Sequence, residues 1–194
     1  MMRTAVYLLL MLVAAAPALG QRPAAGASSG ARAGQPKTVR EFFALLPQKY
    51  FTLEGCVNKL TKKNCDRARA EYLKRHLKVE DVARGYMRGD CDGAQSCFQM
   101  ALFKRPDGTY VVGLTTSLAG DESSYFLEYK GGGWHDVGRR VVPGYGKDKV
   151  YELPRYGTTV KVYENNGLEG NEYSERGPKL YDLAWANGTF TIEK

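Results

Sequence analysis

Residues 98–116 read FQMALFKRPDGTYVVGLTT and carry a complete hairpin signal. Apolar and aromatic residues dominate Phe98–Lys104 and Tyr110–Thr116, and the intervening Pro106-Asp107-Gly108 is typical of a tight turn. Two such segments joined by a short turn pair most readily as antiparallel strands. We therefore predict a β-hairpin here.

The same pattern continues over the rest of the chain after Lys78. Aromatic-rich segments with period-two patterning are separated by turns that contain Gly or Asp, and Asn187-Gly188 is a strong type I′ turn signal. The pattern predicts a hairpin-rich antiparallel meander of about eight strands. The segments expected to form strands are Arg84–Arg88, Phe98–Lys104, Tyr110–Thr116, Tyr125–Tyr129, Trp134–Val137, Val150–Leu153, Thr158–Tyr163, Leu180–Trp185 and Phe190–Ile192.

Two helices are expected before the meander. Thr38 and Glu41 have capping-box spacing, so the first helix begins at Thr38, and Pro47 marks its end. Its apolar stripe consists of Val39, Phe42, Phe43 and Leu46. A second helix is expected from Asn64, as cap, to Lys78. The fold class predicted is α+β, with two N-terminal helices packed on the antiparallel meander. A closed barrel or a sandwich carrying the helices is the alternative, because the pattern does not show whether the meander closes.

The N-terminus reads as an export signal. Arg3 supplies positive charge, Ala5–Ala16 is an apolar run of 12 residues, and small residues follow up to Gly20. The run is shorter than the roughly 20 residues that cross a bilayer, so cleavage is favoured over an uncleaved anchor. We expect a signal peptide over residues 1–20, a flexible leader over 21–37 and a single domain over 38–194. The protein is then secreted or periplasmic, without a transmembrane span in its mature form, and the Ala-rich signal favours a bacterial source.

Composition agrees with one globular domain. Of 194 residues, 43% are hydrophobic and 25% are charged, which disfavours a wholly disordered chain, a collagen-like repeat and a multi-span membrane protein. The net charge of +7 makes the protein basic.

The four cysteines form two pairs that are close in sequence. Cys56 lies near Cys65, and Cys91 lies near Cys97. An exported chain folds under oxidising conditions, so we predict two structural disulfides with this local pairing, although the other two pairings stay open. No C-x-x-C motif and no zinc-ligand spacing occur, which disfavours a redox or metal role.

Few residues suggest catalysis. The two histidines, His76 and His135, are expected in a helix end and on a strand surface, and no nucleophile, base or cofactor motif accompanies them. Asp90 and Asp92 resemble the opening of a calcium loop but lack its terminal bidentate acid, so they are weak metal candidates and a disulfide-closed turn is preferred. Asp121-Glu122 is expected in a solvated turn.

The second helix is the most charged segment. Lys59–Lys78 contains eight basic and two acidic residues. Such a face attracts anionic partners, here a glycan, a lipid headgroup or an acidic protein more readily than nucleic acid, unless it serves only solubility with Glu71 bridging Arg67 and Arg75. The residues assigned to the anionic-partner surface are Lys63, Arg67, Lys74 and Lys78.

A second contact surface is suggested by tyrosines interleaved with basic residues in the C-terminal half. The tyrosines concerned are Tyr145, Tyr151, Tyr156 and Tyr163. Interleaved aromatic and basic side chains suit a stacking platform, although tyrosine is also a common strand residue. Taken together, the sequence predicts a non-enzymatic binding module without a cofactor. An exported hydrolase that uses carboxylates or a metal is the alternative.

Overall fold

The computed structural model describes residues 35–53, 56, 62–91, 97–118, 121–166 and 176–193. All of them belong to one compact unit, Ala33–Lys194. The predicted signal peptide and nearly all of the predicted leader lie outside the described residues, and so does Asp92.

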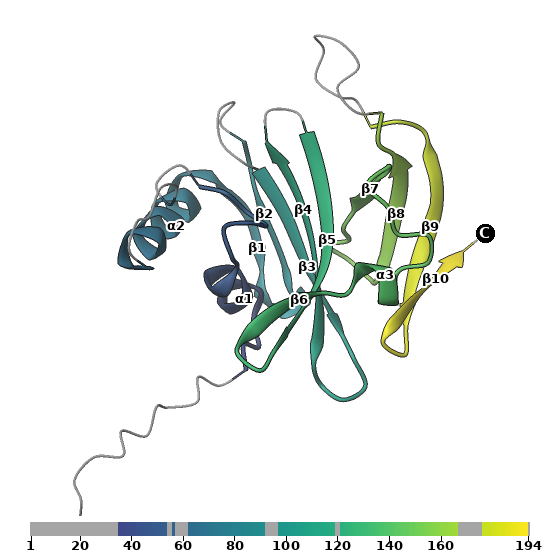
Figure 1. Ribbon diagram of the computed structural model, residues 1–194, viewed down its shortest axis with the longest axis horizontal. Coiled ribbons are helices and arrows are strands. Elements are labelled where there is room, and N and C mark those ends of the chain that lie inside the picture. Colours follow the sequence, from purple (N-terminus) through teal and green to yellow (C-terminus); the bar gives the residue numbers. More distant parts are fainter. Residues whose placement is uncertain are drawn as a thin grey trace, which may run out of the picture. The chain divides into compact units, whose positions relative to one another are not determined.

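Within the described residues, ten antiparallel strands form two sheets (Figure 1). The first sheet has six strands in the order β1-β2-β3-β4-β5-β6, and the second has four in the order β10-β9-β8-β7. The strands of the first sheet are β1 (Leu77–Asp81), β2 (Tyr86–Gly89), β3 (Cys97–Lys104), β4 (Tyr110–Leu118), β5 (Asp121–Lys130) and β6 (Gly133–Asp136). Those of the second are β7 (Lys149–Glu152), β8 (Thr159–Glu164), β9 (Lys179–Ala186) and β10 (Thr189–Glu193).

The predicted α+β class with an antiparallel meander is confirmed, but the described strands divide into a six-stranded meander and a separate four-stranded sheet. They do not form the closed-barrel alternative. The hairpin predicted from residues 98–116 is β3 and β4, in which Lys104 pairs with Tyr110 and Phe98 with Thr116. The Asn187-Gly188 turn is also present between β9 and β10. Both of its residues have positive φ, 52° and 88°, as a type I′ turn requires.

Helix α1 (Val39–Leu45) begins at the predicted capping box. The amide of Glu41 donates to the Thr38 hydroxyl over 3.2 Å, and the Thr38 amide donates to the Glu41 carboxylate over 3.3 Å. Two buried phenylalanines of α1 contact the six-stranded sheet. The Phe43 ring stacks on Phe98 of β3 at 4.8 Å, and Phe42 meets Trp134 of β6 edge-on at 5.9 Å.

Helix α2 (Lys62–His76) ends two residues earlier than predicted. Leu77 and Lys78 belong instead to β1, because residues 77–81 pair with β2 along the edge of the sheet, with Asp81 opposite Tyr86. The predicted strand Arg84–Arg88 begins two residues later than expected, because the backbone turns at Gly85. Gly85 has φ of +64° and follows the short 3-10 turn η2 (Val82–Arg84), so β2 begins only at Tyr86.

The core lies on both faces of the six-stranded sheet. On one face, buried residues of β2–β5 such as Met87, Met100 and Leu114 pack with α1. On the other face, Phe103 and Phe126 pack with the second sheet and with the short helix α3 (Gly138–Val141), which the sequence did not predict. The first sheet is therefore the central layer, with α1 on one side and the second sheet on the other (Figure 1).

Of the two predicted disulfides, the structure contains Cys91–Cys97. The prediction of a Cys56–Cys65 bridge is not met, because both residues are free thiols. The Sγ of Cys65 lies 3.9 Å from the carbonyl oxygen of Cys56 and contacts the backbone there as a weak donor. Among the described helices, none has the length and apolar composition needed to span a membrane.

Candidate ligand-binding pocket

The face of the first sheet that meets the second sheet changes from apolar to polar partway along its strands. Residues two apart on a strand share a face. On β3, Phe103 and Ala101 are buried between the sheets, whereas Gln99 and Cys97 continue the same face beyond this core. The same change occurs on the neighbouring strands, from Val111 and Gly113 to Thr115 and Ser117 on β4, and from Phe126 to Ser124 and Glu122 on β5.

The strand register aligns these polar side chains in a row across the sheet. Gln99 is opposite Arg88 of β2 on one side and opposite Thr115 of β4 on the other. Thr115 is in turn opposite Ser124 of β5, and the two hydroxyl oxygens are 3.0 Å apart. A row that would be apolar in a plain two-layer core is therefore polar here.

Part of this row binds the edge of the second sheet. The free edge strand β7 leaves backbone groups that need partners when buried. The Thr115 hydroxyl donates to the carbonyl oxygen of Tyr151 over 2.7 Å, and the amide of Leu153 donates to Oε1 of Gln99 over 3.3 Å. These bonds hold the two sheets in place and fix the Gln99 amide, whose Nε2 makes no hydrogen bond to another described residue.

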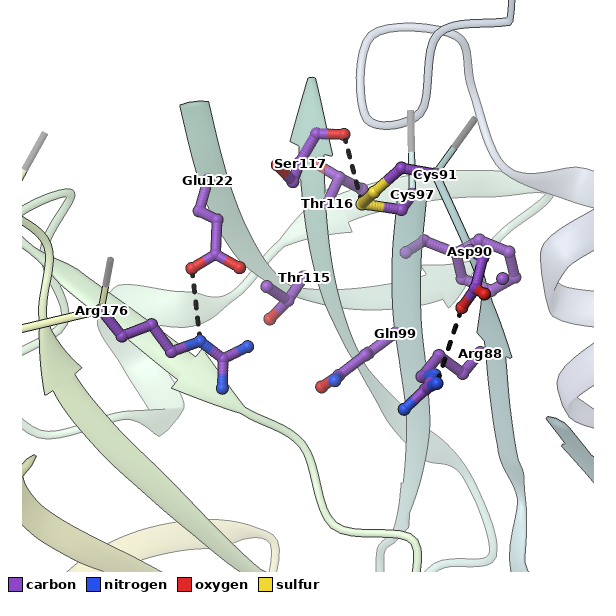
Figure 2. Close-up of a pocket in the computed structure, with 12 residues that line it drawn as sticks. Arg88, Asp90, Cys91, Cys97, Gln99, Thr115, Thr116, Ser117, Glu122 and Arg176 are labelled. Atoms are coloured by element: carbon purple, nitrogen blue, oxygen red, sulfur yellow. Dashed lines mark hydrogen bonds and ion pairs between the residues drawn. A yellow bond between two sulfur atoms is a disulfide. The ribbon is translucent and has the colours of Figure 1, made fainter. Parts of the chain in front are cut away.

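Beyond these bonds the polar face lines a pocket of about 390 Å³ (Figure 2). Figure 2 shows Gln99 and Thr115 at its centre, Arg88 with Asp90 on one side, and Glu122 with Arg176 on the other. The Cys91–Cys97 disulfide closes one end, with Ser117 beside it. Among the described residues, two cationic and two anionic side chains thus line the pocket, and their charges balance.

The first charged pair is loosely held. An Arg88 nitrogen lies 3.5 Å from the Asp90 carboxylate, and Lys78 lies 3.4 Å from the other oxygen of that carboxylate. The side chains of Arg88 and Asp90 are 47% and 42% exposed, so water and ligands reach both. No hydrogen bond to another described residue uses the guanidinium donors of Arg88.

The second charged pair is less exposed. Nε of Arg176 lies 3.5 Å from the Glu122 carboxylate, while another nitrogen of the same guanidinium donates to Glu152 over 2.9 Å. The guanidinium also lies 5.7 Å from the ring centre of Tyr163, within cation–π range. The Glu122 side chain is 19% exposed and accepts no hydrogen bond from a described residue.

The predicted anionic-partner surface is only partly assembled. Arg67 and Lys74 are exposed on α2, and neither has an ion-pair partner in the described part of the chain. Lys78 lies on β1 and pairs with Asp90, and the side chain of Lys63 lies outside the described residues. Glu71 pairs with Arg75 at 3.7 Å but does not bridge to Arg67.

The structure also locates the predicted metal candidate Asp90, the histidine His135 and the tyrosines of the second predicted contact surface. Asp90 faces two cations, and within the described ranges no group of three His, Cys, Asp or Glu residues has metal-site geometry. His135 is an exposed strand residue, as expected. The tyrosine platform is not formed, because Tyr151 is fully buried while Tyr156 is 65% exposed, with the guanidiniums of Arg84 and Arg155 near its ring.

Sequence reasoning missed the pocket residues Gln99, Glu122 and Arg176. Glu122 was expected in a turn, but β5 begins at Asp121 because it pairs with β4 up to Leu118. The available signal was the alternation itself, since the side of β3 that carries Phe103 and Ala101 continues with the polar Gln99. Comparisons of the chain with protein-family models, curated protein sequences and solved structures find no significant match.

Proposed function

We propose that the protein is an exported, non-enzymatic binding module whose ligand is a small polar molecule held in the pocket between the two sheets. The observation that carries this proposal is the polar half of the sheet face, which forms a cavity lined by two arginine–carboxylate pairs instead of closing into core. The Cys91–Cys97 disulfide supports a location outside the reducing cytoplasm.

The pocket suits a polar ligand because its charged groups are incompletely bonded. Each arginine–carboxylate contact that lines it is 3.5 Å long, above the usual hydrogen-bond length for a charged pair. Donors of Arg88 and acceptors of Glu122 are therefore free to exchange water for ligand atoms. Gln99 and Thr115 are held by hydrogen bonds, so the floor is preorganised and costs little entropy on binding.

The test is ligand-observed and protein-observed NMR with four probes of different chemistry: maltose, trialanine, succinate and inorganic phosphate. We expect at least one probe to shift amide signals of the strands that carry Gln99 and Thr115. The Arg88→Gln variant should weaken that binding at least about tenfold, because a charge-assisted hydrogen bond contributes about 1.5–3 kcal/mol. Arg139→Gln is the matched control, since Arg139 is an exposed arginine on α3 outside the pocket and outside the predicted anionic-partner surface.

The pocket proposal is refuted if recognition takes place on the basic surface of α2 instead. If none of the four probes perturbs the pocket strands, the pocket proposal fails. Binding to an anionic polymer such as heparin, lost when Lys63, Arg67, Lys74 and Lys78 are all changed to Glu, would then place recognition on α2 and the start of β1.

A further inference from the structure

The pocket has a cation and an anion on opposite sides, and each makes only one long ion pair with the described residues. Arg88 is on β2 and Glu122 on β5, and Figure 2 shows Gln99 and Thr115 between them. Apart from one ion pair each at 3.5 Å, neither charged group has a hydrogen-bond partner among the described residues. A ligand that meets both must carry an acceptor at one end and a donor at the other.

The side of the pocket at Arg88 presents hydrogen-bond donors. Arg88 and Gln99 are direct cross-strand neighbours, so their side chains lie next to each other on the same face. Oε1 of Gln99 accepts from the Leu153 amide, and among the described residues nothing occupies Nε2. A guanidinium beside an amide NH₂ is a donor set that matches a carboxylate.

The side of the pocket at Glu122 presents an acceptor. Arg176 directs its hydrogen bond to Glu152 and contacts Glu122 only at 3.5 Å, so no hydrogen bond from a described residue occupies either oxygen of the Glu122 carboxylate. Because the Glu122 side chain is largely buried, its charge is less screened than that of an exposed carboxylate. An ammonium group supplies both the compensating charge and three donors.

The dimensions indicate the length of the ligand. Three strand spacings separate β2 from β5, about 14 Å between backbones, and the two long side chains extend over the floor and shorten the gap. An extended peptide advances about 3.3–3.6 Å per residue, so three residues span about 10 Å. The cavity of about 390 Å³ holds a chain of that size with small side chains.

Building on the binding function proposed above, we propose that the ligand is a short zwitterionic peptide of about three residues. Its C-terminal carboxylate binds Arg88 and Nε2 of Gln99, and its N-terminal ammonium binds the Glu122 carboxylate. A zwitterion also fits the balanced charge of the described lining residues, because its two charges replace the loose contacts with Asp90 and Arg176 without adding net charge.

The test compares four forms of one peptide by isothermal titration calorimetry: trialanine with free termini, N-acetylated, C-amidated and doubly blocked. We expect each single block to weaken binding about tenfold, because each removes one charge-assisted contact. Arg88→Gln should weaken the free peptide by a similar factor but leave the affinity of the C-amidated form nearly unchanged. Likewise, Glu122→Gln should weaken binding of the free peptide but leave the affinity of the N-acetylated form nearly unchanged, because that form lacks the ammonium group that Glu122 binds.

Folding of both variants is checked by circular dichroism and thermal melting, and Arg139→Gln serves as the exposed control. The inference is overturned if the doubly blocked peptide binds as tightly as the free one, or if each variant weakens all four forms equally. If trialanine does not bind while maltose, succinate or phosphate binds in an Arg88-dependent way, the zwitterion inference fails and the binding function stands. If no probe reaches the pocket, both fail.

Discussion

The Tyr72 hydroxyl of α2 donates a hydrogen bond of 3.2 Å to the carbonyl oxygen of Asp90, at the rim of the pocket. The Asp90 amide donates in turn to the carbonyl oxygen of His76, the last residue of the helix, over 2.8 Å. Helix α2 therefore positions the backbone that carries Asp90 and leads into the Cys91–Cys97 disulfide. This arrangement depends on close packing at the preceding residue, Gly89.

Gly89→Ala is expected to destabilise the protein. A Cβ at Gly89 would stand 2.6 Å from the Tyr72 hydroxyl and 2.7 Å from an edge carbon of the Phe98 ring. Both side chains are buried, so neither moves away without disturbing the core. Overpacking of this kind costs about 1–3 kcal/mol, and urea denaturation measures the loss.

Gly133→Ala is the matched control for that substitution. Gly133 also lies on a strand of the first sheet, but the nearest atoms to its Cβ position are 3.9 Å away. Its effect should stay within about 0.5 kcal/mol. Equal stability of the Gly89→Ala variant and the wild type would show that Tyr72 and Phe98 do not pack as described.

The limits of sequence prediction follow from the range of the interactions involved. The α1 cap depends on Thr38 and Glu41, three residues apart, and the last hairpin turn depends on Asn187 and Gly188, so local rules locate both. The end of α2 is different. Helical periodicity extends it to Lys78, but pairing with β2 takes over after His76, and that pairing is tertiary.

The pocket is less predictable still. Arg176 reaches the pocket from the segment just before β9, and its position there is shown by ion pairs to Glu122 and Glu152 in two other strands. No local pattern connects these three positions. The sequence of β3 does show that its apolar side becomes polar at Gln99. Predicting a pocket from this change would also have required the knowledge that the second sheet covers mainly the apolar half of the face.

Glu128 should contribute stability that is lost in acid. Burial alone would raise its pKa, but hydrogen bonds from Arg105 and Arg140 outweigh this and hold the pKa of Glu128 below its ordinary value. The contribution is therefore present above the unfolded pKa of about 4.3 and disappears as the pH falls through the lower folded value.

Glu128→Gln tests this linkage. Because the Glu128 side chain is only 13% exposed, the substitution should cost about 1–3 kcal/mol at pH 7. The difference from the wild type should shrink near pH 3, where the wild-type carboxylate also becomes protonated. Denaturant titrations at the two pH values measure the difference in the free energy of unfolding between the wild type and the variant. A difference that grows in acid would contradict the lowered pKa of Glu128.

Cys56 should react slowly with iodoacetamide at neutral pH. Burial, together with a hydrogen bond involving Cys65, raises the pKa of the Cys56 thiol to about 11. Alkylation requires the thiolate, so the labelling rate should rise up to about that pH, as followed by peptide mass spectrometry. Cys65→Ala removes one cause of the shift and should lower the pKa of Cys56. A wild-type labelling midpoint near 8.5, the ordinary value for a free thiol, would refute the prediction.

Loss of the Cys91–Cys97 disulfide should affect both stability and the pocket. The bridge closes a loop with a sequence separation of 6, for which the chain-entropy model gives about 2 kcal/mol. It also joins the segment after Asp90 to the start of β3, two residues before Gln99, so its loss should loosen the Arg88 side of the pocket. The double variant Cys91→Ser and Cys97→Ser should therefore melt at a lower temperature and bind the pocket ligand more weakly.

Dithiothreitol should reproduce both effects in the wild type and change neither in the double variant. Weakened binding without loss of thermal stability would show that the bridge shapes the pocket without stabilising the fold. Unchanged binding would separate the disulfide from recognition.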